Sequence, residues 1–165
     1  KTRLTTLPLD YIRETRNQDP RETNSVASMT STELGARAAQ LAIERAGISP
    51  DRIGLVICNC CNPRETSPTE GQRIADALDL GCPAYDVFTA CPAFALHVDY
   101  LNRFEPEALP EYVLCVSTAT LTHKVNYNDR TDGAIWGDGA AAWIVSPKHE
   151  GKLRVLDTFF ASDPT

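Results

Sequence analysis

The most informative part of the chain reads YDVFTACPAFAL, residues 85–96. Its first residues are typical of a short strand, and the apolar spacing after Pro92 is typical of a helix. Cys91 lies between the two, and proline is favoured at the first position of a helix. The sulfur is therefore expected at a helix N-terminus, where the helix dipole favours a thiolate and free N–H groups can hold an oxyanion.

The chemistry of Cys91 has two interpretations on these residues alone. A strand, a nucleophile and a helix joined by a sharp turn are a recurrent way to expose a nucleophile above a sheet. The alternative is a small buried apolar residue, which is the interpretation that we prefer for the other five cysteines. The run Cys58-Asn59-Cys60-Cys61 lacks the spacing of a zinc site, so no metal is predicted.

Strands and helices alternate on both sides of this turn. Thr30 and Glu33 have the spacing of a capping box, and Gly47 ends the helix that follows. Further helices are expected over 69–80 and 92–104, and strands over 53–58, 84–88, 112–117, 140–146 and 153–160. This alternation predicts a mainly parallel sheet with helices outside it. Residues 1–30 are expected to form an irregular arm or peripheral segment, and residues 31–165 the domain itself.

Composition restricts the function classes. The 165 residues are 42% hydrophobic and carry a net charge of −6, which argues against disorder and against a dedicated nucleic-acid binder. No apolar run approaches the roughly 18 residues of a membrane span. The first twenty residues have charges and no continuous apolar core, so no secretory leader is expected. We therefore expect a cytoplasmic protein that binds neither membrane nor nucleic acid.

Four segments in register resemble one known family, from about residue 30 to residue 146. They are the turn at 85–96, the strand at 51–57, the strand at 81–87, and Asp129-Arg130 followed by WGDGAAA at 136–142. Together they are similar to the thiolase-fold condensing enzymes, most closely to the ketoacyl-acyl-carrier-protein synthase III group. The resemblance implies an α/β thiolase-like fold with a mixed, mainly parallel sheet covered by helices. The chain would be the nucleophile-bearing N-terminal half of a duplicated fold.

The resemblance also implies an activity. Members of this group load an acyl chain onto the cysteine and then join it to a malonyl-type thioester by decarboxylative Claisen condensation. The substrates would be acyl-CoA or acyl-carrier-protein thioesters, with no further cofactor. A His and an Asn that stabilise the enolate lie in the second half, so a complementary C-terminal half is expected as a partner, in a homodimer or heterodimer.

Site residues follow from the same resemblance. Cys91 is the expected catalytic residue. Ser67 stands where the family often has a bulky aromatic residue, and with Pro92 and Phe94 it is assigned to the substrate pocket. The Gly137-Asp138-Gly139 motif is expected to pack below the active site and to allow close backbone approach, which is a structural role. Glu65 and Glu70 are interpreted as surface acids or as donors of a carboxylate across a dimer interface.

Two alternatives remain. An acyltransferase of the same fold would pass the acyl group to an oxygen or nitrogen acceptor, and it would lack the Asn competent for decarboxylation. A non-catalytic partner subunit would keep only the fold, but it would not require a thiol in the turn. The three histidines, His97, His123 and His149, are expected to be solvated or loop residues.

Overall fold

Four strands form one sheet in the order β2-β1-β3-β4. The computed structural model describes residues 4–131, 133–161 and 163. The strands are β1 (Ile53–Cys60), β2 (Ala84–Asp86), β3 (Tyr112–Thr120) and β4 (Asp138–Val145). β1 pairs in parallel with β2 and β3, and β4 runs antiparallel to β3. The mixed, mainly parallel sheet that the sequence predicts is therefore confirmed.

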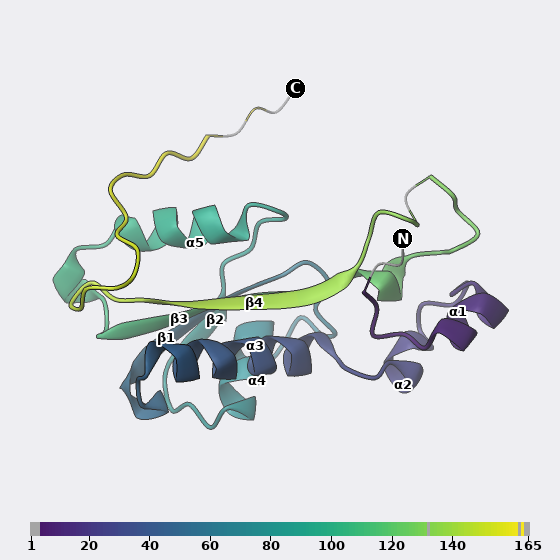
Figure 1. The fold of residues 1–165 in the computed structure, drawn as a ribbon, viewed down its shortest axis with the longest axis horizontal. Coiled ribbons are helices and arrows are strands. Elements are labelled where there is room, and N and C mark those ends of the chain that lie inside the picture. The colour runs from purple at the N-terminus through teal and green to yellow at the C-terminus, as the bar shows by residue number, and fades with distance from the viewer. Residues whose placement is uncertain (1–3, 132, 162, 164–165) are drawn as a thin grey trace.

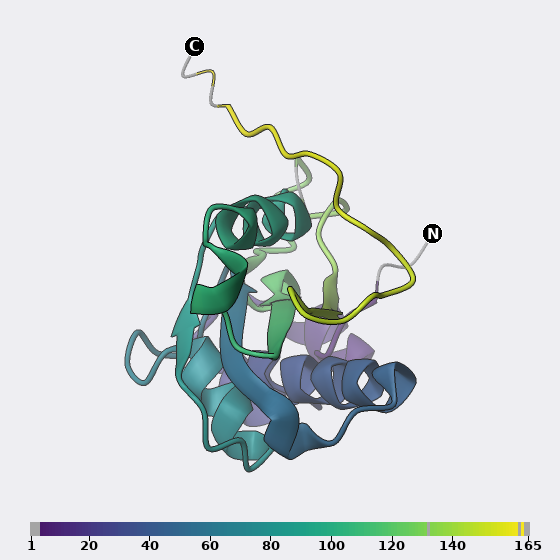
Figure 2. The same ribbon diagram turned by 90° about the vertical axis from the view of Figure 1, so that its left-hand side faces the viewer.

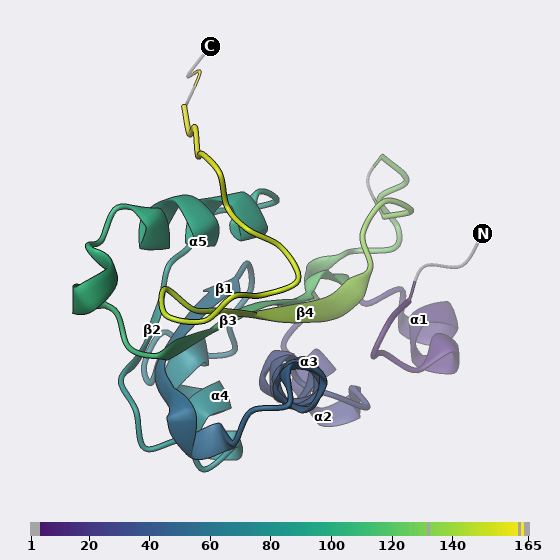
Figure 3. The ribbon, with the colours of Figure 1, turned by 60° about the vertical axis from the view of Figure 1, so that its left-hand side comes forward.

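The helices cover both faces of this sheet (Figure 1). They are α1 (Leu9–Thr15), α2 (Thr23–Val26), α3 (Ser31–Ala46), α4 (Glu70–Ala77) and α5 (Ala93–Asn102), with short 3-10 turns at Pro50–Arg52, Pro106–Ala108 and Leu121–Lys124. Figure 3 shows α3 and α4 below the sheet and α5 above it. This is the half-fold with helices on both faces that the sequence led us to expect.

Alternation along β1 divides the core into two clusters. Val56 and Cys58 are fully buried and belong to the cluster that packs against α3 and α4. Leu55 and Ile57 point to the other face and belong to the cluster that includes Leu101 of α5. Because successive strand side chains point to opposite faces, a strand covered on both sides must be apolar throughout. The nearly continuous apolar run of β1 therefore reflects its central position.

α3 is held at both ends by the signals in its sequence. The Thr30 side chain accepts from the backbone N–H of Glu33, and the Glu33 carboxylate accepts from the backbone N–H of Thr30. Gly47 ends the helix with φ +66, a left-handed conformation that glycine adopts without steric strain. The helix expected after Thr30 is thus confirmed.

The N-terminal segment packs against the end of the sheet from which β4 starts. It contains α1 and α2, and the Asn17 side-chain amide donates to the backbone carbonyls of Thr122, His123 and Val125. Figure 1 shows both helices beside the start of β4, away from α5. The division of the chain at residue 30 stays a prediction.

The strand expected over 153–160 is wrong. These residues form an extended, non-strand segment, and Leu153, Leu156 and Phe159 are each nearly nine-tenths exposed. Figure 2 shows the segment leaving the body of the molecule after it passes β4. Its apolar pattern is that of a strand, but no neighbouring strand is present in the described chain to supply its hydrogen bonds. Within the described residues, no helix is long and apolar enough to cross a membrane.

Candidate active site

Cys91 lies in an exposed turn between β2 and α5. It differs in this from the other cysteines, of which Cys58, Cys60 and Cys115 are buried and Cys61 and Cys82 are half-buried. Burial raises the pKa of the Cys60 thiol to about 12, and it raises the pKa of Cys58 and Cys115 as well. Thiolates are the reactive form of cysteine, so burial makes these three thiols poor nucleophiles.

The first turn of α5 begins one residue later than the sequence predicts. Pro92 occupies the N-cap position and Ala93 is the first helical residue. Among the described residues no side chain caps this turn, and the first intrahelical bond joins the Leu96 N–H to the Pro92 carbonyl. Backbone N–H groups at an uncapped helix start remain available to an anion, as stabilisation of an oxyanion beside Cys91 requires.

Three hydrogen bonds fix the segment that leads from β2 to Cys91. The Val87 N–H donates to the Cys58 carbonyl at 2.8 Å, and the Thr89 N–H donates to Oδ1 of Asn59 at 2.8 Å. On the other side, Nε2 of His97 lies 2.9 Å from the Val87 carbonyl oxygen. The segment is therefore anchored to β1 and to α5, although it has no regular secondary structure.

Asp86 connects the end of β2 to the start of α4. Its two carboxylate oxygens accept from the backbone N–H groups of Glu70 and Gly71, at 3.2 and 2.8 Å. A Cβ at Gly71 would lie 3.0 Å from the Tyr85 carbonyl oxygen, closer than side chains normally pack. Glycine at this position lets helix and strand approach, and the approach holds β2 in place just before Cys91.

The substrate-pocket residues predicted from the sequence lie at the same edge of the sheet. Ser67 is exposed in the loop between β1 and α4, next to a cis peptide bond with Pro68. Phe94 lies in the first turn of α5, 58% exposed, with its ring 5.1 Å from that of Trp143 on β4. Carboxyl ends of parallel strands meet at one edge, which explains the shared location. Their assignment to a substrate pocket, like the catalytic role of Cys91, stays a prediction.

Asp138 of the Gly137-Asp138-Gly139 motif accepts four hydrogen bonds through its carboxylate. Its carboxylate accepts from the backbone N–H and the hydroxyl of Thr6, at 2.7 and 2.8 Å. It also accepts from the backbone N–H and the hydroxyl of Thr122, at 2.9 and 2.7 Å. A Cβ at Gly139 would meet no atom within 4 Å, so the expected close backbone approach does not occur there within the described chain.

The prediction of solvated or loop histidines is wrong for His97, which lies in α5, and His123 lies in the 3-10 turn after β3 but is buried rather than solvated. His97 is fully buried, and His123 is buried with Nε2 2.7 Å from the Thr6 hydroxyl. Burial lowers the pKa of both imidazoles. His149 is half exposed, stacks on Tyr112 and bonds to Glu111.

Glu70 is also not the surface acid that the sequence suggests. It is fully buried, and its Oε1 accepts from the Thr32 hydroxyl at 2.7 Å. Its Oε2 has no partner among the described residues. Glu65 remains exposed and pairs with Arg73. The Glu70 carboxylate therefore points into its own chain, and the interpretation that it reaches across a dimer interface is wrong.

A cavity of about 440 Å³ lies between the N-terminal segment and the loop that follows β3. We call it the arm groove, and its lining residues are Thr5, Leu9, Ile12, Thr122, Tyr127, Asp129, Arg130, Gly133, Ala134 and Trp136. It begins where β3 ends, at the sheet edge that also bears Cys91. Sequence reasoning did not find it, because its walls come from segments more than a hundred residues apart.

Asn59, His97 and Trp143 are further residues that sequence reasoning missed. Asn59 is a polar residue inside the otherwise apolar run of β1, which is the one signal that could have singled it out. His97 and Trp143 lie on different elements, and their rings are 5.4 Å apart. Nothing in the sequence indicates that pairing.

Comparisons with known proteins relate this chain to one family. A family model for 3-oxoacyl-[acyl-carrier-protein] synthase III matches residues 85–164. A beta-ketoacyl-[acyl-carrier-protein] synthase III of Aliarcobacter butzleri is 36% identical over 81% of this chain, and one of Campylobacter curvus is 34% identical over 82%. The match covers 40% and 41% of those proteins, so the chain spans about two fifths of their length.

The same relationship holds for the fold. The crystal structure of 3-oxoacyl-[acyl-carrier-protein] synthase III from Aquifex aeolicus superposes with a TM-score of 0.69 at 26% sequence identity. The superposition covers 80% of this chain and 41% of that one. The resemblance to part of the thiolase-like synthase III fold is confirmed.

Proposed function

Because this chain is similar to synthase III proteins in sequence and in its thiolase-like fold, we propose that Cys91 forms a covalent acyl intermediate in a decarboxylative condensation. The observation that carries the proposal is the position of Cys91. It is the one exposed thiol among six, all within the described residues, and it lies beside the uncapped start of α5. That placement suits a nucleophile and is unusual for a packing residue.

In the first step the Cys91 thiolate attacks the carbonyl carbon of an acyl thioester. A new S–C bond forms, and the carbonyl oxygen becomes an oxyanion that the first N–H groups of α5 can stabilise. The bond from carbon to the sulfur of CoA or carrier protein then breaks. That thiol leaves with the electron pair and takes up a proton, which leaves the acyl group on Cys91.

In the second step a malonyl-type thioester loses CO2 and becomes an enolate. The enolate carbon attacks the acyl carbonyl on Cys91, the S–C bond breaks, and the Cys91 thiolate is restored. The His and Asn that would stabilise the enolate are assigned to the part of the relatives' length that this chain does not span. The acyl-CoA and carrier-protein substrates, the complementary segment and the dimer all belong to this proposal.

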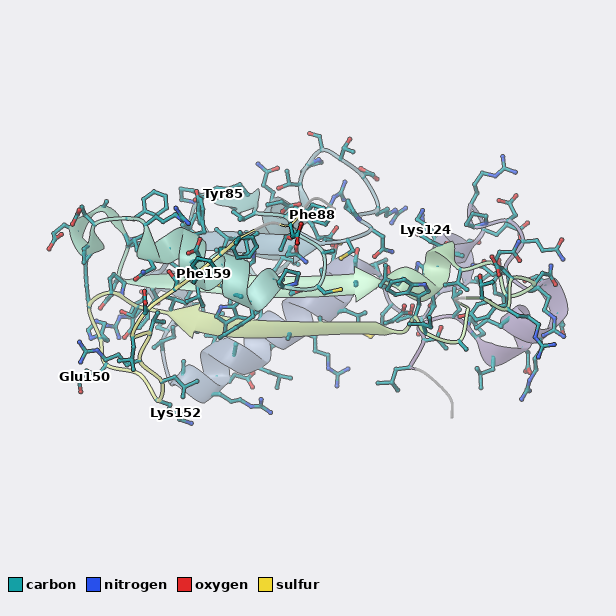
Figure 4. The ribbon with its side chains drawn as sticks, turned by 90° about the horizontal axis from the view of Figure 1, so that it is seen from above. Tyr85, Phe88, Lys124, Glu150, Lys152 and Phe159 are labelled. Carbon is teal, nitrogen blue, oxygen red and sulfur yellow. The ribbon has the colours of Figure 1, made fainter. Side chains whose placement is uncertain are left out.

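The face around α5 supports a complementary segment. Phe88 and Phe94 are 60% and 58% exposed, and Phe159 is 90% exposed. Figure 4 shows Phe88 and Phe159 on the side of the sheet that bears α5. The Asn102 side-chain amide donates to the Thr158 hydroxyl at 3.3 Å, which places the final segment against α5. Large aromatic side chains gathered on one face indicate a surface that another part of the protein covers.

The arm groove is the site that we assign to the CoA portion of the acyl donor. Arg130 is exposed in it and can pair with a phosphate, and Trp136 at its border can stack on an adenine ring. The groove lies at the sheet edge that bears Cys91, so a donor anchored there can reach the turn. Asp129 is the acidic residue of the groove, and Thr131 holds its carboxylate by two hydrogen bonds within the local turn.

The test is covalent labelling of the protein at its natural length. After incubation with a short acyl-CoA, intact-mass measurement should show one added acyl group, and peptide mapping should place it on Cys91. Cys91→Ala should abolish the label, whereas Cys61→Ala, which changes a half-buried thiol, should retain it. Retention of the label in Cys91→Ala would refute the assignment.

A second measurement separates the condensing enzyme from its rivals. Addition of malonyl thioester to the acylated protein should release CO2 and remove the label as a 3-oxoacyl product. Removal of the label only by an alcohol or amine would indicate an acyltransferase. A protein that never acquires the label would be a non-catalytic subunit.

A further inference from the structure

His97 lies in the second turn of α5 and joins this helix to the end of β2. It is fully buried, and its Nε2 is 2.9 Å from the carbonyl oxygen of Val87. The contact closes a loop from residue 87 to residue 97, and Cys91 lies in the middle of that loop. The carbonyl that His97 holds is therefore part of the segment that carries the nucleophile.

The chemistry of this contact fixes the state of the imidazole. A carbonyl oxygen only accepts hydrogen bonds, so Nε2 must carry the hydrogen and donate it. Nδ1 then keeps a lone pair, and it is buried with no partner among the described residues. A proton on Nδ1 would place a buried positive charge without a hydrogen-bond partner, and the desolvation of that charge outweighs the attraction of the nearby Asp86 carboxylate. The neutral Nε2–H tautomer is the form that the structure accommodates.

A second buried side chain holds the same segment from the opposite side. Asn59 of β1 is 1% exposed, its Oδ1 accepts from the Thr89 N–H, and its Nδ2 reaches the Ser117 hydroxyl at 3.4 Å. Cys91 follows Thr89 by two residues. The turn is thus fixed between β1 and α5, and within the described chain His97 is the α5 residue whose side chain bonds to it.

We propose that His97 is a positioning residue for Cys91, holding the Val87 carbonyl so that the sulfur stays beside the first N–H groups of α5. The proposal rests on the proposed function, because it matters for acyl transfer only if Cys91 is the nucleophile. His97 follows Cys91 by six residues, so it acts through the backbone of the turn and does not need to touch the substrate.

The His97 ring has a second role, packing, that the experiment must separate from its hydrogen bond. The ring lies 5.4 Å from that of Trp143, tilted by 38°. His97→Phe keeps an aromatic ring against Trp143 and removes the donor. His97→Gln removes the ring and keeps an N–H donor at the end of the side chain. If the His97 ring acts only by packing, His97→Phe should acylate Cys91 faster than His97→Gln. If the hydrogen bond positions Cys91, His97→Gln should be the faster variant.

The experiment measures acylation of Cys91 by a short acyl-CoA in the protein at its natural length. We expect His97→Phe to lower the rate constant of acylation about 10- to 100-fold with little change in KM, as expected when a reacting group is displaced by about 1 Å. His97→Gln should retain the rate within about fivefold of the wild type. A Phe variant as fast as the wild type, or faster than the Gln variant, would overturn the proposal.

His149→Phe is the matched control. It makes the same change at a histidine that stacks on Tyr112, at the start of β3 and therefore at the edge of the sheet opposite Cys91. It should acylate at the wild-type rate. If the wild type itself is not acylated, the proposed function fails; if it is acylated and His97→Phe is unaffected, only the positioning role fails.

A measurement on the wild type covers the case in which a His97 variant does not fold. The ¹⁵N chemical shifts of the imidazole distinguish the two neutral tautomers. At neutral pH His97 should be the Nε2–H tautomer, with its proton protected from exchange. Observation of the Nδ1–H tautomer would contradict the hydrogen bond to Val87 and with it the proposal.

Discussion

The Asp138 side chain connects three separate segments of the chain by hydrogen bonds. The sequence marks it as a turn residue between two glycines, and the structure gives its carboxylate four donors from Thr6 and Thr122. Two of those donors are backbone N–H groups, which must be satisfied when water is excluded. The carboxylate thereby joins the N-terminal segment, the end of β3 and the start of β4.

Asp138→Asn should destabilise the protein by about 2 kcal/mol, because an amide supplies one acceptor oxygen and turns its NH2 toward donors. Urea denaturation measures the change in the free energy of unfolding. Asp157→Asn alters an exposed carboxylate on the final segment, and its effect should stay within about 0.5 kcal/mol. Equal effects of the two substitutions would show that the four hydrogen bonds add nothing to stability.

Substitution of Arg130 tests the assignment of the arm groove to the CoA portion of the acyl donor. If it pairs with a phosphate of the acyl donor, Arg130→Ala should raise KM for acyl-CoA about tenfold and leave kcat nearly unchanged, because the contact is the same in ground and transition state. Arg37→Ala on the exposed side of α3 is the control and should not change KM. Single-turnover kinetics of Cys91 acylation over a range of acyl-CoA concentrations decide this, and an unchanged KM in Arg130→Ala would remove the groove from the donor site.

At the scale of elements, the turn around Cys91 is built by packing rather than by a local code. Asp86 caps the first N–H groups of α4, and the same strand end continues into the segment that Asn59 and His97 hold. β2 has only three residues, Ala84–Asp86, and a strand this short needs such external support. Local signals predict the strand and the helix, but the orientation of the turn between them comes from β1 and α5.

α3 provides the test at this scale, because its stability comes partly from its cap. Thr30→Ala should lower the free energy of unfolding by about 1 kcal/mol, the usual effect of losing a threonine N-cap. The pKa of the Glu33 carboxyl is lowered by its hydrogen bonds to the Thr30 backbone and side chain, so this contribution is present at neutral pH and is lost as pH falls below about 4.5. Denaturation at pH 7 and pH 3.5 should show the difference between wild type and Thr30→Ala shrinking, and a constant difference would contradict the role of the ionised carboxylate.

At the scale of the whole molecule, the two faces of the sheet are covered unequally. α3 and α4 close one face with a large buried cluster, whereas the face under α5 has a smaller one. Figure 3 shows α5 as the helix on that side, with the final segment beside it. Phe88, Phe94 and Phe159 are exposed there, and this is the face on which we propose that the complementary segment packs.

Acid should destabilise the whole molecule through its buried histidines. Burial lowers the pKa of His97 and His123 in the folded state, so the unfolded chain binds protons first as pH falls. The free energy of unfolding is therefore highest above about pH 6.5 and decreases below it. Urea denaturation at pH 7.5 and 5.5 should show this loss, and His97→Gln should reduce it. An equal loss in His97→Gln would mean that His97 is not protonated on unfolding.

The sequence by itself determined α3, α4, α5, the four strands of the sheet, their order along the chain and the turn that contains Cys91, because cap residues, strand periodicity and turn residues act over short distances. Thr30, Gly47 and the apolar run of β1 each specify local structure in this way. The tertiary structure alone decided that residues 153–160 form no strand, that His97 and Glu70 are buried, and that the arm groove exists. These features depend on contacts between distant segments, and solvent exposure is a property of the assembled molecule rather than of neighbouring residues.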